Sequence, residues 1–226
     1  MAQAVATTHG PSYRDWQAFF DPGLALARRY DDPDYRFAVV PLAKHWDAYF
    51  FPLDGYSLAQ GWYRQSDAIH DMALRRGGTR DAARYAAWPR SVAVKYVFVG
   101  RAALEPDARG LPRLLASSSQ FVQVAGAGRW TVYRVTYPEP ILTTTAGQLD
   151  RASHVVRCER TELVLRIARA GDYRVKDTWS PYWSLAGGPG RVWRASGDWA
   201  DVRVDRAGLY RLRSRASVGK VLGQLL

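Results

Sequence analysis

The sequence is poor in cysteine and histidine and has no long apolar run, and these absences exclude several kinds of site. A single cysteine, Cys158, permits neither an intrachain disulfide nor a thiolate-rich metal site, and its strand-like neighbours favour a buried, unreactive thiol. The four histidines lie far apart without metal-ligand spacing, so we expect no metal and no cofactor. No run of about 18 apolar residues is present, and residues 1–12 lack the apolar core of a signal peptide. We therefore expect no membrane-spanning helix within this sequence.

Catalytic motifs are also absent. The sequence contains neither the Gly-x-Ser-x-Gly elbow of a serine hydrolase nor a glycine-rich phosphate loop. Asp47, Asp54 and Asp67 could supply paired carboxylates for glycosidic chemistry, but their settings in turns and at helix starts favour structural roles. We therefore assign no catalytic residue.

Acidic residues are scarce relative to basic ones. The chain carries 32 Lys and Arg against 21 Asp and Glu, a net charge of +11. Residues 1–100 hold 12 basic and 10 acidic residues, whereas residues 101–226 hold 20 and 11. A polyanion or an anionic membrane surface could be attracted by such an excess. The basic residues form no run and no recognised nucleic-acid module, so we interpret them as solvated strand faces and expect no nucleic-acid partner.

Aromatic residues, in contrast, are abundant, at 13% of the chain. They are prominent in the segment Gly171–Trp183, whose alternating first half predicts a strand. Ser180-Pro181 then breaks the strand, and Trp179, Tyr182 and Trp183 surround the break. These rings either plug the end of a β-sandwich or form a stacking platform for a sugar. We expect Trp183 in the core and Trp179 with Tyr182 exposed.

A second aromatic concentration lies at residues 44–65, which we expect to be irregular. If it meets the first concentration, its side chains could complete a ligand site with Asp177, Trp179 and Tyr182. Aromatic faces would contact sugar C–H groups, and neighbouring Asp, Gln and Arg side chains would fix the orientation. The candidates from this segment are Trp62, Tyr63 and Gln65.

The order of predicted elements indicates an α+β chain. Residues 1–34 are a lead and a short helix interrupted by Pro22-Gly23, and residues 35–140 are an α/β part. The apolar residues 92–99 predict a central strand in a sheet covered on both faces. The other elements expected in the α/β part are a strand at 36–41, helices at 66–75 and at 79–88 ended by Pro89, a short helical piece at 114–117, and a hairpin of 121–124 and 130–135.

The second half changes character, because helical periodicity is lost and short strands recur between turns. This pattern predicts an antiparallel, jelly-roll-like β-sandwich at residues 141–216, followed by a tail at 217–226. We expect essentially no helix over residues 150–215. The predicted strands are 153–158, 161–168, 172–178, 191–195, 200–204 and 209–214.

Several short motifs occur in an order that resembles a known family. They are Arg36-Phe-Ala-Val-Val-Pro, Gly55-Tyr with Gly61-Trp-Tyr-Arg-Gln, Val94-Lys-Tyr-Val-Phe-Val, Phe121 with Trp130-Thr-Val-Tyr-Arg-Val, and Gly171-Asp-Tyr-Arg-Val with Trp179-Ser-Pro-Tyr-Trp. Over residues 35–215 the chain resembles the extracytoplasmic part of YfhO-like and 6-pyruvoyl-tetrahydropterin-synthase-related bacterial polytopic membrane proteins. These are relatives of the C-type membrane glycosyltransferases.

The resemblance implies a non-catalytic domain at the extracytoplasmic face of the bacterial cell membrane. Its partners would be a glycan or lipid-linked sugar and the membrane-embedded remainder of a glycosyltransferase-like parent. The catalytic acid of such enzymes belongs to a membrane-proximal loop that nothing in this sequence matches. A free-standing glycoside-active enzyme and a basic polyanion or nucleic-acid binder remain the alternatives.

Overall fold

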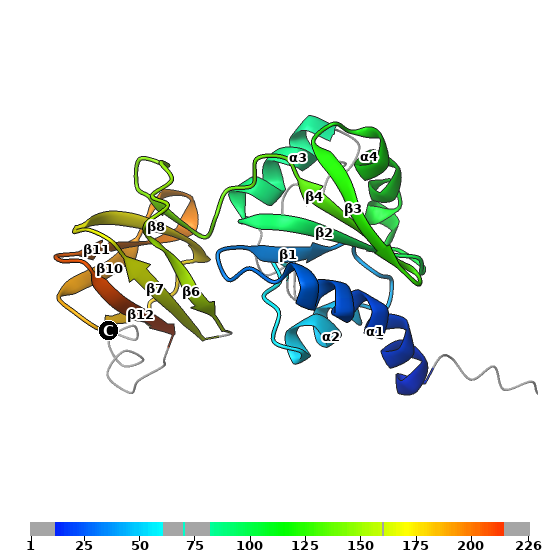
Figure 1. Ribbon diagram of the computed structural model, residues 1–226, viewed down its shortest axis with the longest axis horizontal. Helices are drawn as coiled ribbons and strands as arrows, with labels where there is room; N and C mark the ends of the chain where they lie inside the picture. The colour runs from blue at the N-terminus through cyan, green and yellow to red at the C-terminus, as the bar shows by residue number, and fades with distance from the viewer. Residues whose placement is uncertain (1–11, 61–69, 71–81, 160, 215–226) are drawn as a thin grey trace, which may run out of the picture.

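The computed structural model describes residues 12–60, 70, 82–159 and 161–214. The chain is an α+β protein with a helix-covered sheet and a β-sandwich side by side (Figure 1). Within the described residues, no helix combines the length and the apolar character that crossing a lipid bilayer requires.

The first helix, α1 (Tyr13–Tyr30), is longer than expected because Pro22-Gly23 does not interrupt it. Ser12 and Asp15 form a capping box, and Asp15 N–H donates to the Ser12 hydroxyl at 3.3 Å. A Cβ at Gly23 would lie 2.9 Å from the ring of Trp130, whose Nε1 donates to the Phe19 carbonyl at 2.7 Å. Pro22-Gly23 is thus part of the surface on which α1 packs, and this contact outweighs the local cost of proline in a helix.

The sheet of the first part has the strand order β1-β2-β4-β3. β1 (Arg36–Val39) and β2 (Val94–Gly100) pair in parallel, and β4 (Trp130–Val135) pairs antiparallel with β2 and with β3 (Phe121–Ala127). β2 is an interior strand, and its last four residues are buried. The predicted central strand at 92–99 and the predicted hairpin are therefore confirmed.

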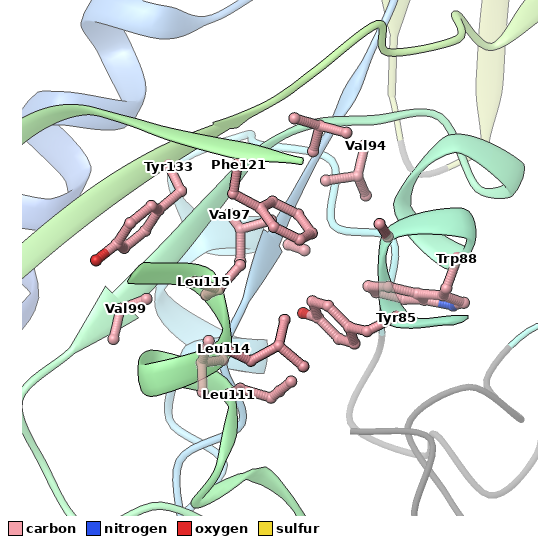
Figure 2. Packing of buried hydrophobic residues seen from close by; sticks show 14 of the residues in the cluster. Tyr85, Trp88, Val94, Val97, Val99, Leu111, Leu114, Leu115, Phe121 and Tyr133 are labelled. Atoms are coloured by element: carbon pink, nitrogen blue, oxygen red, sulfur yellow. The ribbon is translucent and has the colours of Figure 1, made fainter. Parts of the chain in front are cut away.

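Helices cover both faces of this sheet, as Figure 1 shows. α1 and α2 (Asp47–Leu53) lie on one face, and α3 (Ala82–Ser91) and α4 (Leu111–Ser117) lie on the other. A short 3-10 helix, η4 (Pro106–Ala108), precedes α4. Figure 2 shows side chains of α3 and α4 converging on β2, β3 and β4; those labelled are Tyr85, Trp88, Val94, Val97, Val99, Leu111, Leu114, Leu115, Phe121 and Tyr133.

Two helical expectations are wrong in this part. α2 lies in the segment expected to be irregular, because Phe50 and Phe51 enter the core beneath α1. Pro89 lies inside α3 rather than ending it, and the helix continues to Ser91. Burial of Tyr85 and Trp88 against the sheet stabilises this helix despite the proline. The helix expected at 66–75 lies outside the described residues.

The second part is a sandwich of two four-stranded antiparallel sheets, ordered β10-β11-β8-β5 and β6-β7-β12-β9. Its strands are β5 (Leu142–Thr144), β6 (His154–Cys158), β7 (Glu162–Ile167), β8 (Gly171–Thr178), β9 (Trp183–Ala186), β10 (Gly190–Arg194), β11 (Trp199–Val204) and β12 (Gly208–Ser214). Within the described residues 150–214, the 3-10 turn η5 (Ser196–Asp198) is the single helical element, which confirms the expectation of essentially no helix. β5 and β9 were not expected.

The two parts share their cores. Ala93, which precedes β2, is fully buried in the core cluster of the sandwich, and Trp199 of β11 packs against the core of the first part. Asp34 joins the parts through two hydrogen bonds, because its carbonyl accepts from Ile141 N–H at 2.8 Å and its Oδ1 accepts from Val155 N–H at 2.6 Å. The boundary between the parts is therefore a packed and hydrogen-bonded interface.

Candidate functional site

A cavity of about 440 Å³ lies at this interface. We call it the interface pocket. Its walls come from the start of β1, Pro52 in the last turn of α2, residues 55–60, the ends of β6 and β8, and the start of β11, together with Val92 and His70. Such a volume falls in the range of small-molecule sites.

Arg36 is the buried charge at the base of the interface pocket. Its side chain is 9% exposed, and Nη2 lies 3.0 Å from Oδ2 of Asp177. Nη1 donates to the Lys176 carbonyl and, at 3.4 Å, to the Val92 carbonyl. The guanidinium therefore connects β1, the end of α3 and β8, and it holds the Asp177 carboxylate at the pocket wall.

Lys176 is the second buried cation of this wall. Its Nζ lies 2.6 Å from Oε2 of Glu139 and donates to the Arg90 carbonyl at 2.8 Å. Burial lowers the pKa of Lys176, although Glu139 opposes this shift. Both buried cations thus have protein carboxylates as partners, and the pocket carries little uncompensated positive charge.

Two stacked rings form one side of the pocket. The centroids of His70 and Trp199 are 3.7 Å apart, and the rings are inclined by 28°. The His70 ring nitrogens lie 2.9 Å from the Gly197 carbonyl and 3.4 Å from the Thr178 hydroxyl. Positive φ angles at Gly197 and Asp198 form the turn that introduces Trp199. The imidazole and indole rings thus form one aromatic stack, with the Thr178 hydroxyl beside it.

The opposite side is a chain segment that runs along β1. Phe37 N–H donates to the Ser57 carbonyl and Ala59 N–H donates to the Phe37 carbonyl, both at 2.9 Å. These bonds place residues 55–60 beside the sheet, where Tyr56 and Gln60 are largely buried and line the pocket. The segment supplies an amide and hydroxyl groups, which are suited to hydrogen-bonding a polar ligand.

Cys158 also lines the pocket, at the end of β6. Its side chain packs against the sandwich core, and burial raises the pKa of the thiol. The raised pKa favours the protonated thiol, and the residue is half-buried rather than fully buried.

The predicted ligand residues are distributed unevenly with respect to this pocket. Asp177 lines it, whereas Trp179 and Tyr182 are half-buried beyond its wall. Trp183 is buried and donates from Nε1 to the Thr178 carbonyl at 3.0 Å, which confirms its place in the core. Trp179 packs against the same core and is half-buried, so the expected exposure of its ring is only partial. The remaining candidates, Trp62, Tyr63 and Gln65, lie outside the described residues.

Trp199 and Gln60 line the pocket but were not among the candidates expected from the sequence. The signal at Trp199 was an aromatic residue directly after the Gly197-Asp198 turn, at the start of a strand. Gln60 lies in the segment that we expected to be irregular, and a single glutamine there carries no signal. Neither position has a motif, because the pocket forms only when the two parts meet.

Of the carboxylates considered for glycosidic chemistry, Asp47 and Asp54 lie at opposite ends of α2. Asp47 is buried in the first turn of α2, and Asp54 pairs with Arg28 at 3.5 Å. Asp67 lies outside the described residues. In the described part of the chain, no group of three or more His, Cys, Asp or Glu side chains is arranged to hold a metal.

Comparisons of the chain with protein-family models, with curated proteins and with solved structures find no match. The interpretation of the interface pocket therefore depends on its own geometry and chemistry.

Proposed function

We propose that this chain is a non-catalytic, extracytoplasmic glycan-binding domain and that a neutral sugar unit occupies the interface pocket. The supporting observation is the composition of the pocket: the Trp199–His70 stack on one side, and Gln60, Tyr56, Thr178 and Asp177 around it. Sugar rings are bound by this combination of aromatic faces and fixed hydrogen-bonding groups.

The charge of the pocket favours a neutral ligand. Arg36 is paired with Asp177, and Lys176 is paired with Glu139. A phosphate or carboxylate would have to compete with these protein carboxylates for the two cations. A neutral pyranose needs only donors and acceptors, and the pocket supplies them.

The experiment is calorimetric titration of the full chain with a panel of cell-wall oligosaccharides. We expect Gln60→Ala and Thr178→Val to weaken binding about 5- to 30-fold each, because each removes a group that can pair with a sugar hydroxyl. Trp199→Phe should weaken binding by reducing the stacking surface. Trp193→Phe, on β10 and away from the pocket, is the matched control and should bind like the wild type.

Two results would contradict this proposal. One is the absence of binding to every oligosaccharide by a folded wild-type chain. The other is an equal loss of affinity in Trp193→Phe and Trp199→Phe, because a ligand in the interface pocket contacts Trp199 alone.

We further propose that the domain belongs to a larger membrane glycosyltransferase-like protein, as the family resemblance implies. The check is the gene: coding sequence for transmembrane helices beside this chain would support the proposal. A gene that encodes this chain alone would contradict it.

A glycoside-active enzyme is the second candidate, because Asp177 and Glu159 both line the pocket. Most glycosidases use a pair of carboxylates as their catalytic groups. Release of reducing sugar from the same oligosaccharides, abolished by Glu159→Gln, would favour the enzyme over the binding domain.

A further inference from the structure

The outer face of the β6-β7-β12-β9 sheet carries a group of arginines that the interface pocket does not use. Leu163, Leu165 and Ile167 of β7 and Tyr210 and Leu212 of β12 are buried in the sandwich core. The alternating residues of these strands therefore point outward. We call this surface the arginine face; its exposed or half-buried residues are Val156, Arg157, Glu162, Arg166, Leu209, Arg211 and Arg213, and Val164 between Arg157 and Arg211 is buried.

Strand register brings these side chains together in rows. Val164 pairs with Arg157 on one side and with Arg211 on the other. Arg166 pairs with Leu209, and Glu162 pairs with Arg213. Directly opposed residues have Cβ atoms about 5 Å apart, so the four guanidinium groups share one surface.

Glu162 organises three of the four arginines. Its carboxylate accepts from Arg157 at 3.0 Å and from Arg213, and Arg211 lies 4.0 Å away. The hydrogen bond from Arg213 contributes most to lowering the pKa of Glu162, so the carboxylate stays charged at neutral pH. Glu159 is a second carboxylate, 3.0 Å from Arg157. Four guanidinium groups against two carboxylates leave a surplus of positive charge on this face.

Aliphatic side chains lie among these charges. Val156 is 43% exposed and Leu209 is 41% exposed. The register shift between Val155 and Arg157 is a bulge, which turns Val156 outward beside Arg157. The described strand residues of this face present no Phe, Tyr or Trp outward.

We propose that the arginine face docks on an anionic phospholipid surface. Guanidinium groups bind lipid phosphates, and exposed Val and Leu side chains enter the headgroup region of a bilayer. A soluble polyanion has no apolar region that would bury these Val and Leu side chains. Sugars and unpaired bases are bound through aromatic stacking, for which the described strand residues of this face offer no outward Phe, Tyr or Trp. The observation is independent of the interface pocket and of the glycan proposal.

The test is sedimentation of the full chain with vesicles of mixed phosphatidylglycerol and phosphatidylcholine, and with pure phosphatidylcholine vesicles. We expect binding to the mixed vesicles only, and weakening as salt is raised. The double variant Arg166→Ser/Arg211→Ser should lose roughly 10- to 30-fold in affinity. Arg109→Ser/Arg113→Ser removes the same charge from exposed positions on the first part and should bind like the wild type.

The variant Leu209→Ser distinguishes docking on a lipid surface from binding of a soluble polyanion. It should weaken vesicle binding and leave any binding of duplex DNA or polyglutamate unchanged. Equal binding to pure phosphatidylcholine, or an equal loss in both double variants, would overturn the proposal. Tighter binding of DNA or polyglutamate that depends on Arg166 and Arg211 would also overturn it, because the face would then belong to a soluble polyanion.

Discussion

At the scale of the residue, the buried side chain of Arg36 links the two parts of the molecule. Its side chain has one carboxylate and two carbonyl partners from different elements. Arg36→Ala leaves these acceptors without a donor, and Asp177 is 32% exposed, so water compensates only in part. We expect a loss of about 2–4 kcal/mol in the free energy of unfolding.

Urea denaturation measures this loss. The matched control is Arg28→Ala, which breaks an exposed pair with Asp54 and should cost less than about 1 kcal/mol. Equal effects of the two substitutions would show that burial of Arg36 contributes nothing.

Lys176 gives a prediction with a defined pH dependence. Burial lowers its pKa below the ordinary value of 10.5. Between the lowered pKa and 10.5 the Lys176 site binds more protons in the unfolded chain than in the folded chain, so the contribution of Lys176 to stability should rise with pH across that window. Lys176→Met removes the cost of burying the charge, and Glu139, with a side chain 54% exposed, remains solvated. We expect Lys176→Met to be about 1–2 kcal/mol more stable at pH 7, with the difference shrinking in alkaline solution.

Denaturation at neutral and alkaline pH tests this prediction, with the exposed Lys44→Met as control. A difference between wild type and Lys176→Met that stays constant or widens as pH rises would contradict it.

At the scale of the element, the turn between β9 and β10 requires glycine. Gly187 has a φ of +107°, and a Cβ there would lie 2.3 Å from the Leu209 carbonyl oxygen. Gly187→Ala combines backbone strain with a backbone clash, so we expect a loss of about 2–4 kcal/mol. Gly147 has a φ of +76°, but a Cβ there would lie in open space. Gly147→Ala should therefore cost about 1–2 kcal/mol in the free energy of unfolding. Thermal unfolding compares the two variants, and a larger effect at Gly147 would contradict the account.

Sequence periodicity predicted the strands with a clear apolar pattern. It failed for elements whose conformation depends on tertiary contacts. The apolar residues 92–99 and the alternating strands of the second half carry their own signal, and the structure contains them. Pro22 and Pro89 were interpreted as helix interruptions, but each lies inside a helix that packs on the sheet. β5 is only three residues long, and its pairing with β8 cannot be inferred from so short a segment.

At the scale of the whole molecule, the shared cores predict one cooperative unit. Ala93 belongs to the core of the sandwich, and Trp199 packs on the core of the first part. Separating the parts would expose both side chains and break the Arg36 contacts. We expect a single calorimetric transition with equal calorimetric and van't Hoff enthalpies. Two resolved transitions would contradict this prediction.

The candidate site is formed by both parts of the molecule together, and for this reason the sequence predicted little of it. Asp177, which lines the pocket, was a candidate because it lies in the aromatic-rich strand segment. Gln60 and Trp199 are 139 positions apart in the sequence and become neighbours of one pocket only through the packing of the two parts. No local pattern in either segment encodes that contact.

The central claim, a sugar in the interface pocket, is tested most directly by nuclear magnetic resonance of the indole N–H groups. The full chain, labelled with ¹⁵N, is titrated with a cell-wall oligosaccharide, and the Trp199 and Trp193 signals are assigned from the two phenylalanine variants. We predict a saturable shift of the Trp199 signal and an unchanged Trp193 signal. A shift of Trp179 without Trp199, or no shift at saturating oligosaccharide, would contradict the claim.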